Sequence, residues 1–258
     1  ITGEYPFLTI DATYFKAREN HRIISKAFMI AYATDDQGHR EILGFGVYAN
    51  ESKETWKSFI RDLKARGLRN VLMITSDAHE GLCDAISKEF PQAAWQRCQF
   101  HFSKNIAEKA PKKYQAGIRS ELSEMFNCTT IEEARRKRDS IIADYQDVAE
   151  SAMTCLDEGF ESSMTAMILP KYLRQYFRTS NHIERINREL KRRSKVIGVF
   201  PNEASILRLM GSVLMELNDT AQARKALFSP KTYNNLMSAE VKSKLIILAN
   251  EQHLLRVL

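Results

Sequence analysis

The order of strand signals near the start of the chain is the feature that most constrains its fold. Residues 5–11, 26–34 and 41–49 are rich in β-branched, aromatic and other apolar side chains and have strand character. The segment Asp35–Gly38, between the second and third of these, has the composition of a hairpin turn. We therefore expect an antiparallel meander of three strands, the first of which ends on Asp11.

Helices and strands alternate after this meander. Ser52 can cap a helix that Gly67 would end. The residues of this helix at core-facing spacing are Trp56, Phe59, Ile60 and Leu63. Val71–Ile74 is wholly apolar, as in a strand buried on both faces, and a short helix then ends near Pro91. With residues 93–98 as a fifth strand, the order of elements is that of a ribonuclease H-like α/β fold, which is the fold class we predict.

The rest of the chain has helical patterns. From His101 to about Met167, apolar stripes and a capping box at Thr130 and Glu133 predict an all-α insertion. The two stripes are Ile118, Leu122 and Met125, and Ile141, Tyr145 and Val148. A break at Phe200–Asn202 precedes another predicted helix, which carries Ile206, Leu209, Met210, Val213 and Leu217. The predicted domains are a first core part (1–100), the insertion (101–170), a second core part (171–215) and a C-terminal helical tail (216–258).

Composition argues against a disordered chain, a membrane-spanning protein and a disulfide-stabilised secreted protein. A chain of 258 residues with 44% hydrophobic content can bury a substantial core. No apolar run approaches the roughly 20 residues that span a bilayer. Four scattered cysteines without a disulfide-framework spacing favour reduced thiols inside a cell. The chain begins with Ile, without a basic start and apolar core, so we expect a fragment that carries no signal peptide.

Two acidic residues lie at the ends of predicted strands that are distant in sequence. Asp11 is the last residue of the first predicted strand, and Asp77 follows Thr75-Ser76 at the end of the buried strand. The predicted topology places the middle of the first strand beside the end of the fourth, so we expect the two carboxylates to be neighbours. Such a pair is costly unless a divalent cation lies between them, and carboxylate oxygens select Mg²⁺ or Mn²⁺. Taken alone, Asp11 is more typical of a turn or cap residue.

The segment Asn181–Lys195 predicts a helix with one acid at the head of a basic stripe. Ile183, Ile186, Leu190, Ser194 and Ile197 fall on one face, whereas Glu184, Arg188, Lys191 and Lys195 share another. Between Lys171 and Lys195, nine basic residues and two acids give a net charge of +7, whereas the whole chain carries +6. The basic excess is therefore local and suits a polyanion such as the DNA backbone. The phosphate contacts we predict are Lys191, Arg192, Arg193 and Lys195, followed by Arg185 and Arg188.

Each of these signals has a simpler interpretation. Glu184 could complete a capping box with Asn181 or pair with Arg188 one turn later. The basic stripe could be an ordinary solvated face. Glu189 is an alternative acid, although helix geometry turns it well away from Glu184.

Cys98 and His101 have the spacing of half a zinc site, but no second Cys/His pair stands nearby in sequence. A buried thiol beside a hydrogen-bonded histidine is the favoured interpretation. His79 could orient a nucleophile or a phosphate, or be a simple surface histidine. Trp56 and Trp95 are most simply core residues.

Five signatures occur in a fixed order along the chain. They are Asp11-Ala-Thr-Tyr14, Thr75-Ser-Asp-Ala-His-Glu-Gly81, Cys98-Gln-Phe-His101, Asn181-His-Ile-Glu-Arg-Ile-Asn187 followed by Lys191-Arg-Arg193, and Phe200-Pro-Asn202. With these signatures, the chain resembles the Mutator-type transposases of bacterial insertion sequences over roughly residues 5–215.

The resemblance implies a catalytic triad of Asp11, Asp77 and Glu184 that holds two Mg²⁺ or Mn²⁺ ions on a ribonuclease H-like fold. It also implies a helical insertion between the second and third acids, and it places Cys98, His101 and Asn187 near the acids as structural residues. The family's N-terminal DNA-binding region is missing here, which points to a catalytic-core fragment.

The function expected from the resemblance is hydrolysis of a DNA strand at terminal inverted repeats, followed by attack of the freed 3′-hydroxyl on target DNA. The implied partners are double-stranded DNA and further copies of the chain, in a dimer or higher assembly, in the bacterial cytoplasm at the nucleoid. Two alternatives stay open. One is a ribonuclease H-like nuclease or resolvase without strand transfer, and the other is a domesticated relic that binds DNA without catalysis.

Overall fold

The computed structural model describes residues 1–257 and contains a five-stranded mixed sheet in the order β3-β2-β1-β4-β5. Strands β1 (Phe7–Glu19), β2 (Arg22–Thr34) and β3 (Arg40–Tyr48) pair antiparallel, which confirms the predicted meander. The predicted end of the first strand is wrong, because β1 pairs with β2 for eight residues beyond Asp11. Asp11 therefore lies in the middle of β1.

A tight turn explains why β1 is longer than predicted. Asn20 and His21 connect the paired residues Glu19 and Arg22, with φ angles of +48° and +61°. Two consecutive residues of positive φ form the hairpin turn that matches the twist of paired strands. Because His21 stands where glycine is usual, the sequence carries only a weak turn signal there.

The helix and strand that follow the meander form largely as predicted. Helix α1 (Lys53–Ala65) is capped by Ser52, whose side chain accepts a hydrogen bond of 3.3 Å from the Thr55 amide. Gly67, at φ +108°, follows its C-terminal end, and the four predicted core residues of α1 are buried. Strand β4 (Met73–Ser76) begins two residues later than predicted and ends directly before Asp77.

Helix α2 (Glu80–Glu89) and strand β5 (Ala94–Arg97) complete this part of the chain. Leu72 tethers the segment before β4: its amide donates to the Pro6 carbonyl at 2.9 Å, and its carbonyl accepts from the Ala94 amide at 2.9 Å. Both predicted core tryptophans, Trp56 and Trp95, are buried.

The chain divides into two compact units, which we describe separately. The first unit contains residues 1–74, 79–94 and the chain from Ser180 onward, and the second contains Thr75–Ala78 and Trp95–Thr179. Strands β4 and β5 thus each end in the second unit.

The second unit is helical apart from these strand ends. Its elements are α3 (Gln99–Lys109), α4 (Lys112–Phe126), α5 (Ile131–Tyr145), α6 (Glu150–Ser163), a 3₁₀ turn η1 (Thr165–Ile168) and α7 (Lys171–Phe177). The predicted capping box at Thr130 and Glu133 is present, and the stripe on α4 is buried. The second predicted stripe extends beyond its helix: α5 ends at Tyr145, and Val148 lies in the turn after it with a side chain that is 41% exposed.

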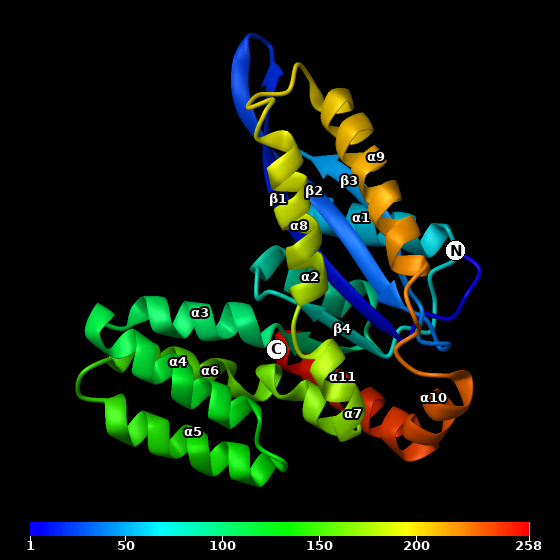
Figure 1. The fold of residues 1–258 in the computed structure, drawn as a ribbon. Coiled ribbons are helices and arrows are strands. Elements are labelled where there is room, and N and C mark those ends of the chain that lie inside the picture. The colour runs from blue at the N-terminus through cyan, green and yellow to red at the C-terminus, as the bar shows by residue number, and fades with distance from the viewer. Residues whose placement is uncertain (258) are drawn as a thin grey trace. The chain divides into compact units, whose positions relative to one another are not determined.

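In the first unit, helices α8 (Asn181–Ser194) and α9 (Glu203–Gln222) cover one face of the meander (Figure 1). Two apolar residues of the predicted helices are exposed. Ile197 is 38% exposed because it lies beyond the end of α8, and Leu209 on α9 is 40% exposed. Helices α10 (Pro230–Leu236) and α11 (Ala239–Val257) follow, and α11 packs on α2. Among the described residues, none of the helices combines the length and apolar character that a membrane crossing requires.

Candidate active site

Asp11 lies on the face of β1 that α8 covers. Successive residues of a strand point to opposite faces, and Phe15 and Ala17, which share a face with Asp11, belong to the core beneath α8 and α9. The side-chain amide of Asn187, on α8, donates a hydrogen bond of 2.8 Å to Oδ2 of Asp11. The half-buried carboxylate of Asp11 is therefore tied directly to α8 within the first unit.

Glu184 lies in the first turn of α8, three residues before Asn187. Residues three apart on a helix are neighbours on its surface, so Glu184 and Asn187 share one flank of α8. The Ser180 hydroxyl donates to Oε1 of Glu184 at 3.1 Å, and Glu184 is half-buried. The alternative of a capping box with Asn181 is wrong, because the cap is Ser180 and Asn181 is already helical. Asp11 and Glu184 are thus both associated with the flank of α8 that carries Asn187.

Asp77 follows β4 directly and belongs to the second unit. The preceding residue, Ser76, is fixed by three hydrogen bonds. Its hydroxyl donates to the Asp77 carbonyl at 2.7 Å and accepts from Trp95 Nε1 at 2.9 Å, and its carbonyl accepts from the Cys98 amide at 2.7 Å. The backbone before Asp77 is therefore held by β5 and by the start of α3. In the sheet order, β4 is the neighbour of β1.

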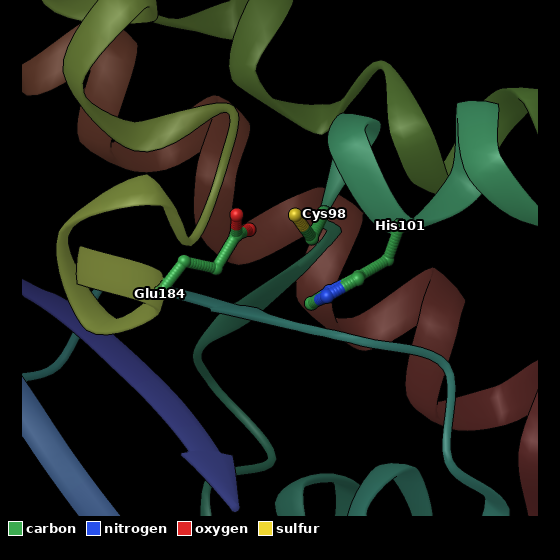
Figure 2. A group of neighbouring side chains, drawn as sticks. All are labelled: Cys98, His101 and Glu184. Atoms are coloured by element: carbon green, nitrogen blue, oxygen red, sulfur yellow. The ribbon is translucent and has the colours of Figure 1, made fainter. Parts of the chain in front are cut away.

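Cys98 and His101 lie at the start of α3, as the N-cap residue and in the first turn (Figure 2). Cys98 is fully buried and His101 is half-buried, and the Cys98 sulfur and a His101 ring nitrogen lie within 4.8 Å of each other. Figure 2 also draws Glu184, which comes from the start of α8 in the first unit. A structural zinc site has four protein ligands, whereas Cys98 and His101 supply two.

The basic residues predicted on α8 fall into two groups. Arg185, Arg188, Lys191 and Lys195 are exposed. Arg192 and Arg193 are already engaged within the chain.

Arg192 forms an ion pair with Glu189 at 2.6 Å, and Arg193 forms ion pairs with Glu189 at 2.8 Å and with Glu216 at 3.3 Å. Hydrogen bonds from Arg192 and then Arg193 lower the pKa of Glu189 to about 2. Glu189 therefore serves as the partner of these arginines.

Sequence reasoning missed Ser180 as a partner of Glu184 and Asn187 as a partner of Asp11. A serine four residues before an acid at a helix start is a usable signal for the first contact. The second contact depends on the packing of α8 on β1, for which the sequence has no local signal.

The chain matches a protein family described as "Transposase, Mutator family" over residues 1–223. It belongs to this family, which includes transposases of insertion sequences.

Two relatives illustrate the similarity. The chain is 40% identical over 233 residues to the transposase for insertion sequence element IS256 in transposon Tn4001 of Staphylococcus aureus, a match that covers 90% of the chain and 58% of the relative. It is 37% identical over 217 residues to the transposase for insertion sequence element IS1081 of Mycobacterium tuberculosis, covering 84% of the chain and 52% of the relative. The chain thus spans somewhat more than half the length of these relatives.

Proposed function

We propose that this chain is the catalytic core of a DNA transposase, with Asp11, Asp77 and Glu184 as its catalytic acids. The observation that carries the proposal is the hydrogen bond from Asn187 to Asp11. It links the acid on β1 to the helical segment that also carries Glu184, so two of the three acids are associated with one flank of α8. Asp77 completes the set at the end of β4, the strand next to β1.

The proposed fold is ribonuclease H-like. Three antiparallel strands, a mixed sheet with β1 between β2 and β4, and a run of helices before α8 support this assignment. The domain boundaries that we propose are those of the sequence, with the helical insertion at residues 101–170 between the second and third acids.

The residues around Asp11 fit a hydrated divalent cation. Carboxylate oxygens are the ligands that Mg²⁺ and Mn²⁺ prefer. Asn187 Oδ1 and Thr13 Oγ1 are buried and have no hydrogen-bond partner among the described residues. A buried acceptor is costly without a donor, and metal-bound water molecules are donors. Asp11, Asp77 and Glu184 would hold two Mg²⁺ ions, which supply an activated nucleophile and stabilise the leaving oxygen in phosphodiester chemistry.

The chain's own residues would position the reactants. Asn187 orients the Asp11 carboxylate, and Ser180 orients that of Glu184. The exposed cations of α8, led by Lys191 and Lys195, would hold the DNA backbone through its phosphates.

Two substitutions at phosphorus make up the proposed reaction. In the first, water attacks a phosphodiester at the element end, the P–O3′ bond breaks and a 3′-hydroxyl is released. In the second, this hydroxyl attacks a target phosphodiester, a new P–O bond forms and the target strand's own 3′-oxygen leaves with a proton.

The proposed partners are double-stranded DNA, as terminal inverted repeats and target, and a second copy of the protein in a dimer or higher assembly. The proposed location is the bacterial cytoplasm, at the nucleoid. Because the chain spans somewhat more than half the length of its relatives, these properties are proposed for the whole protein.

A strand-transfer assay separates the proposal from its two alternatives. The chain is incubated with Mg²⁺, a target plasmid and short duplexes that end in a pre-cut 3′-hydroxyl. Joined products that disappear in Asp11→Asn support the proposal. Cleavage without joining would favour a nuclease or resolvase, and DNA binding without either reaction would favour a non-catalytic relic.

A further inference from the structure

A pocket separate from the proposed acids opens in the first unit between α8, α9 and strands β2 and β3. Its volume is about 310 Å³. Its lining residues are Tyr32, Ile42, His182, Arg185, Ile186, Leu217, Thr220, Ala221 and Arg224. The lining includes two arginines and no aspartate or glutamate. This volume is at the lower end of the roughly 300–1,000 Å³ of small-molecule sites.

The aromatic wall of the pocket is built from Tyr32 and His182. Their rings are stacked, with centroids 5.8 Å apart and an angle of 22° between the planes. Tyr32 is 6% exposed and belongs to the core on the α8 side of the sheet. The packing of β2 in the core therefore holds Tyr32 in place.

Three guanidinium groups determine the charge of the pocket. The positive charges of Arg40, Arg224 and Arg185 all act on the Tyr32 hydroxyl, where they oppose the rise in pKa that burial causes. Within residues 1–257, none of the three arginines forms a salt bridge with an acid. The pocket thus gathers positive charge that lacks a counter-ion from the chain.

We propose that this pocket binds a phosphate group, held by Arg185 and Arg224 against the Tyr32–His182 wall. Arginine is suited to this role because its planar fork of donors matches phosphate oxygens in a bidentate geometry. Thr220 is not the anchor, since its hydroxyl already donates to the Glu216 carbonyl at 3.0 Å.

The position on α8 makes this phosphate different from the reacting one. His182 and Glu184 are two residues apart, which is about 200° around a helix. The pocket therefore lies on the flank of α8 opposite to the flank that carries Glu184 and Asn187. We assign the phosphate to the DNA backbone away from the point of cleavage, an assignment that rests on the proposed function. The phosphate site itself rests only on the pocket.

The direct test is a titration of the full chain with inorganic phosphate, followed through the imidazole resonances of His182 by NMR. The expected result is a saturable shift in the wild type and an affinity at least about tenfold weaker in Arg224→Gln, because a charged hydrogen bond is lost. Arg208→Gln is the matched control: it makes the same change on α9, outside the pocket lining, and should leave the titration unchanged. Arg224→Lys keeps the charge and should recover part of the affinity.

Absence of a saturable shift at His182, or equal weakening by Arg208→Gln, would overturn the phosphate site. A second arm tests the source of the phosphate. Arg224→Gln should lower the slope of log affinity for duplex DNA against log salt by about one unit. If the pocket binds inorganic phosphate but Arg224→Gln leaves the salt slope of DNA binding unchanged, the anion site stands and its assignment to DNA is overturned. Asp11→Asn should leave the phosphate titration intact, so failure of the catalytic proposal is distinguishable from failure of the pocket.

Discussion

Asn187 on α8 donates a hydrogen bond of 2.8 Å to Asp11 on β1, across a separation of 176 residues in sequence. The bond joins the first acid of the proposed triad to the helix that carries the third. It also leaves the other amide atom, Oδ1 of Asn187, buried without a hydrogen-bond partner among the described residues. In the proposed site, the packing of α8 on β1 is therefore what links Asp11 to the helix of Glu184.

Asp11→Asn should abolish Mg²⁺-dependent strand cleavage while DNA binding is roughly retained. The amide keeps the shape of the side chain but removes the charge that a cation requires, so we expect cleavage to fall by at least about a hundredfold. Gel-based cleavage and fluorescence anisotropy measure the two quantities on the same duplex. Unchanged cleavage in a folded variant would contradict the role of Asp11.

Asn187→Ala should destabilise the fold and raise the Mg²⁺ concentration needed for half-maximal cleavage. The variant removes a hydrogen bond to a charged, half-buried group, which is worth about 1.5 kcal/mol. Thermal unfolding and a Mg²⁺ titration test the two effects. Asn235→Ala, on an exposed residue of α10, is the control and should alter neither. A lower melting temperature with an unchanged Mg²⁺ requirement would assign Asn187 a purely structural role.

Glu189→Gln should tighten DNA binding. Glu189 holds Arg192 and Arg193 in ion pairs, so its neutralisation frees two cations of the predicted phosphate-binding set. We expect the salt dependence of binding to become steeper by up to about two units, whereas Lys191→Gln should make it shallower by about one. Equal salt slopes in wild type and Lys191→Gln would remove this surface of α8 from the DNA interface.

Glu189 should also make the stability of the fold fall at acidic pH. The arginines lower the pKa of Glu189 from 4.5 to about 2, so the unfolded chain binds more protons than the folded chain between these values. The stability from this group is present above about pH 4.5 and is lost as the pH falls toward 2. Acid unfolding of Glu189→Gln should therefore be less steep in this window than that of the wild type. Identical acid unfolding curves would show that the ion pairs do not persist in solution.

The sequence predicted the meander, the cap at Ser52 and the apolar side of α8, because each depends on local periodicity or on a local hydrogen bond. Prediction failed where the structure depends on a turn with a weak sequence signal or on packing between segments distant in sequence. The Asn20–His21 turn lacks glycine, so the length of β1 was missed. The pairing of Glu189 with two arginines could have been anticipated from the i, i+3 and i, i+4 spacing. The His182 pocket could not, since Tyr32 and Arg224 come from segments far away in sequence.

Anomalous diffraction from a crystal of the chain with DNA and Mn²⁺ tests the proposed triad of acids. We expect Mn²⁺ bound by carboxylate oxygens of Asp11, Asp77 and Glu184, with metal–oxygen distances of about 2.1 Å. Mn²⁺ at Cys98 and His101 alone, or a bound ion that leaves Asp11 without contact, would contradict it.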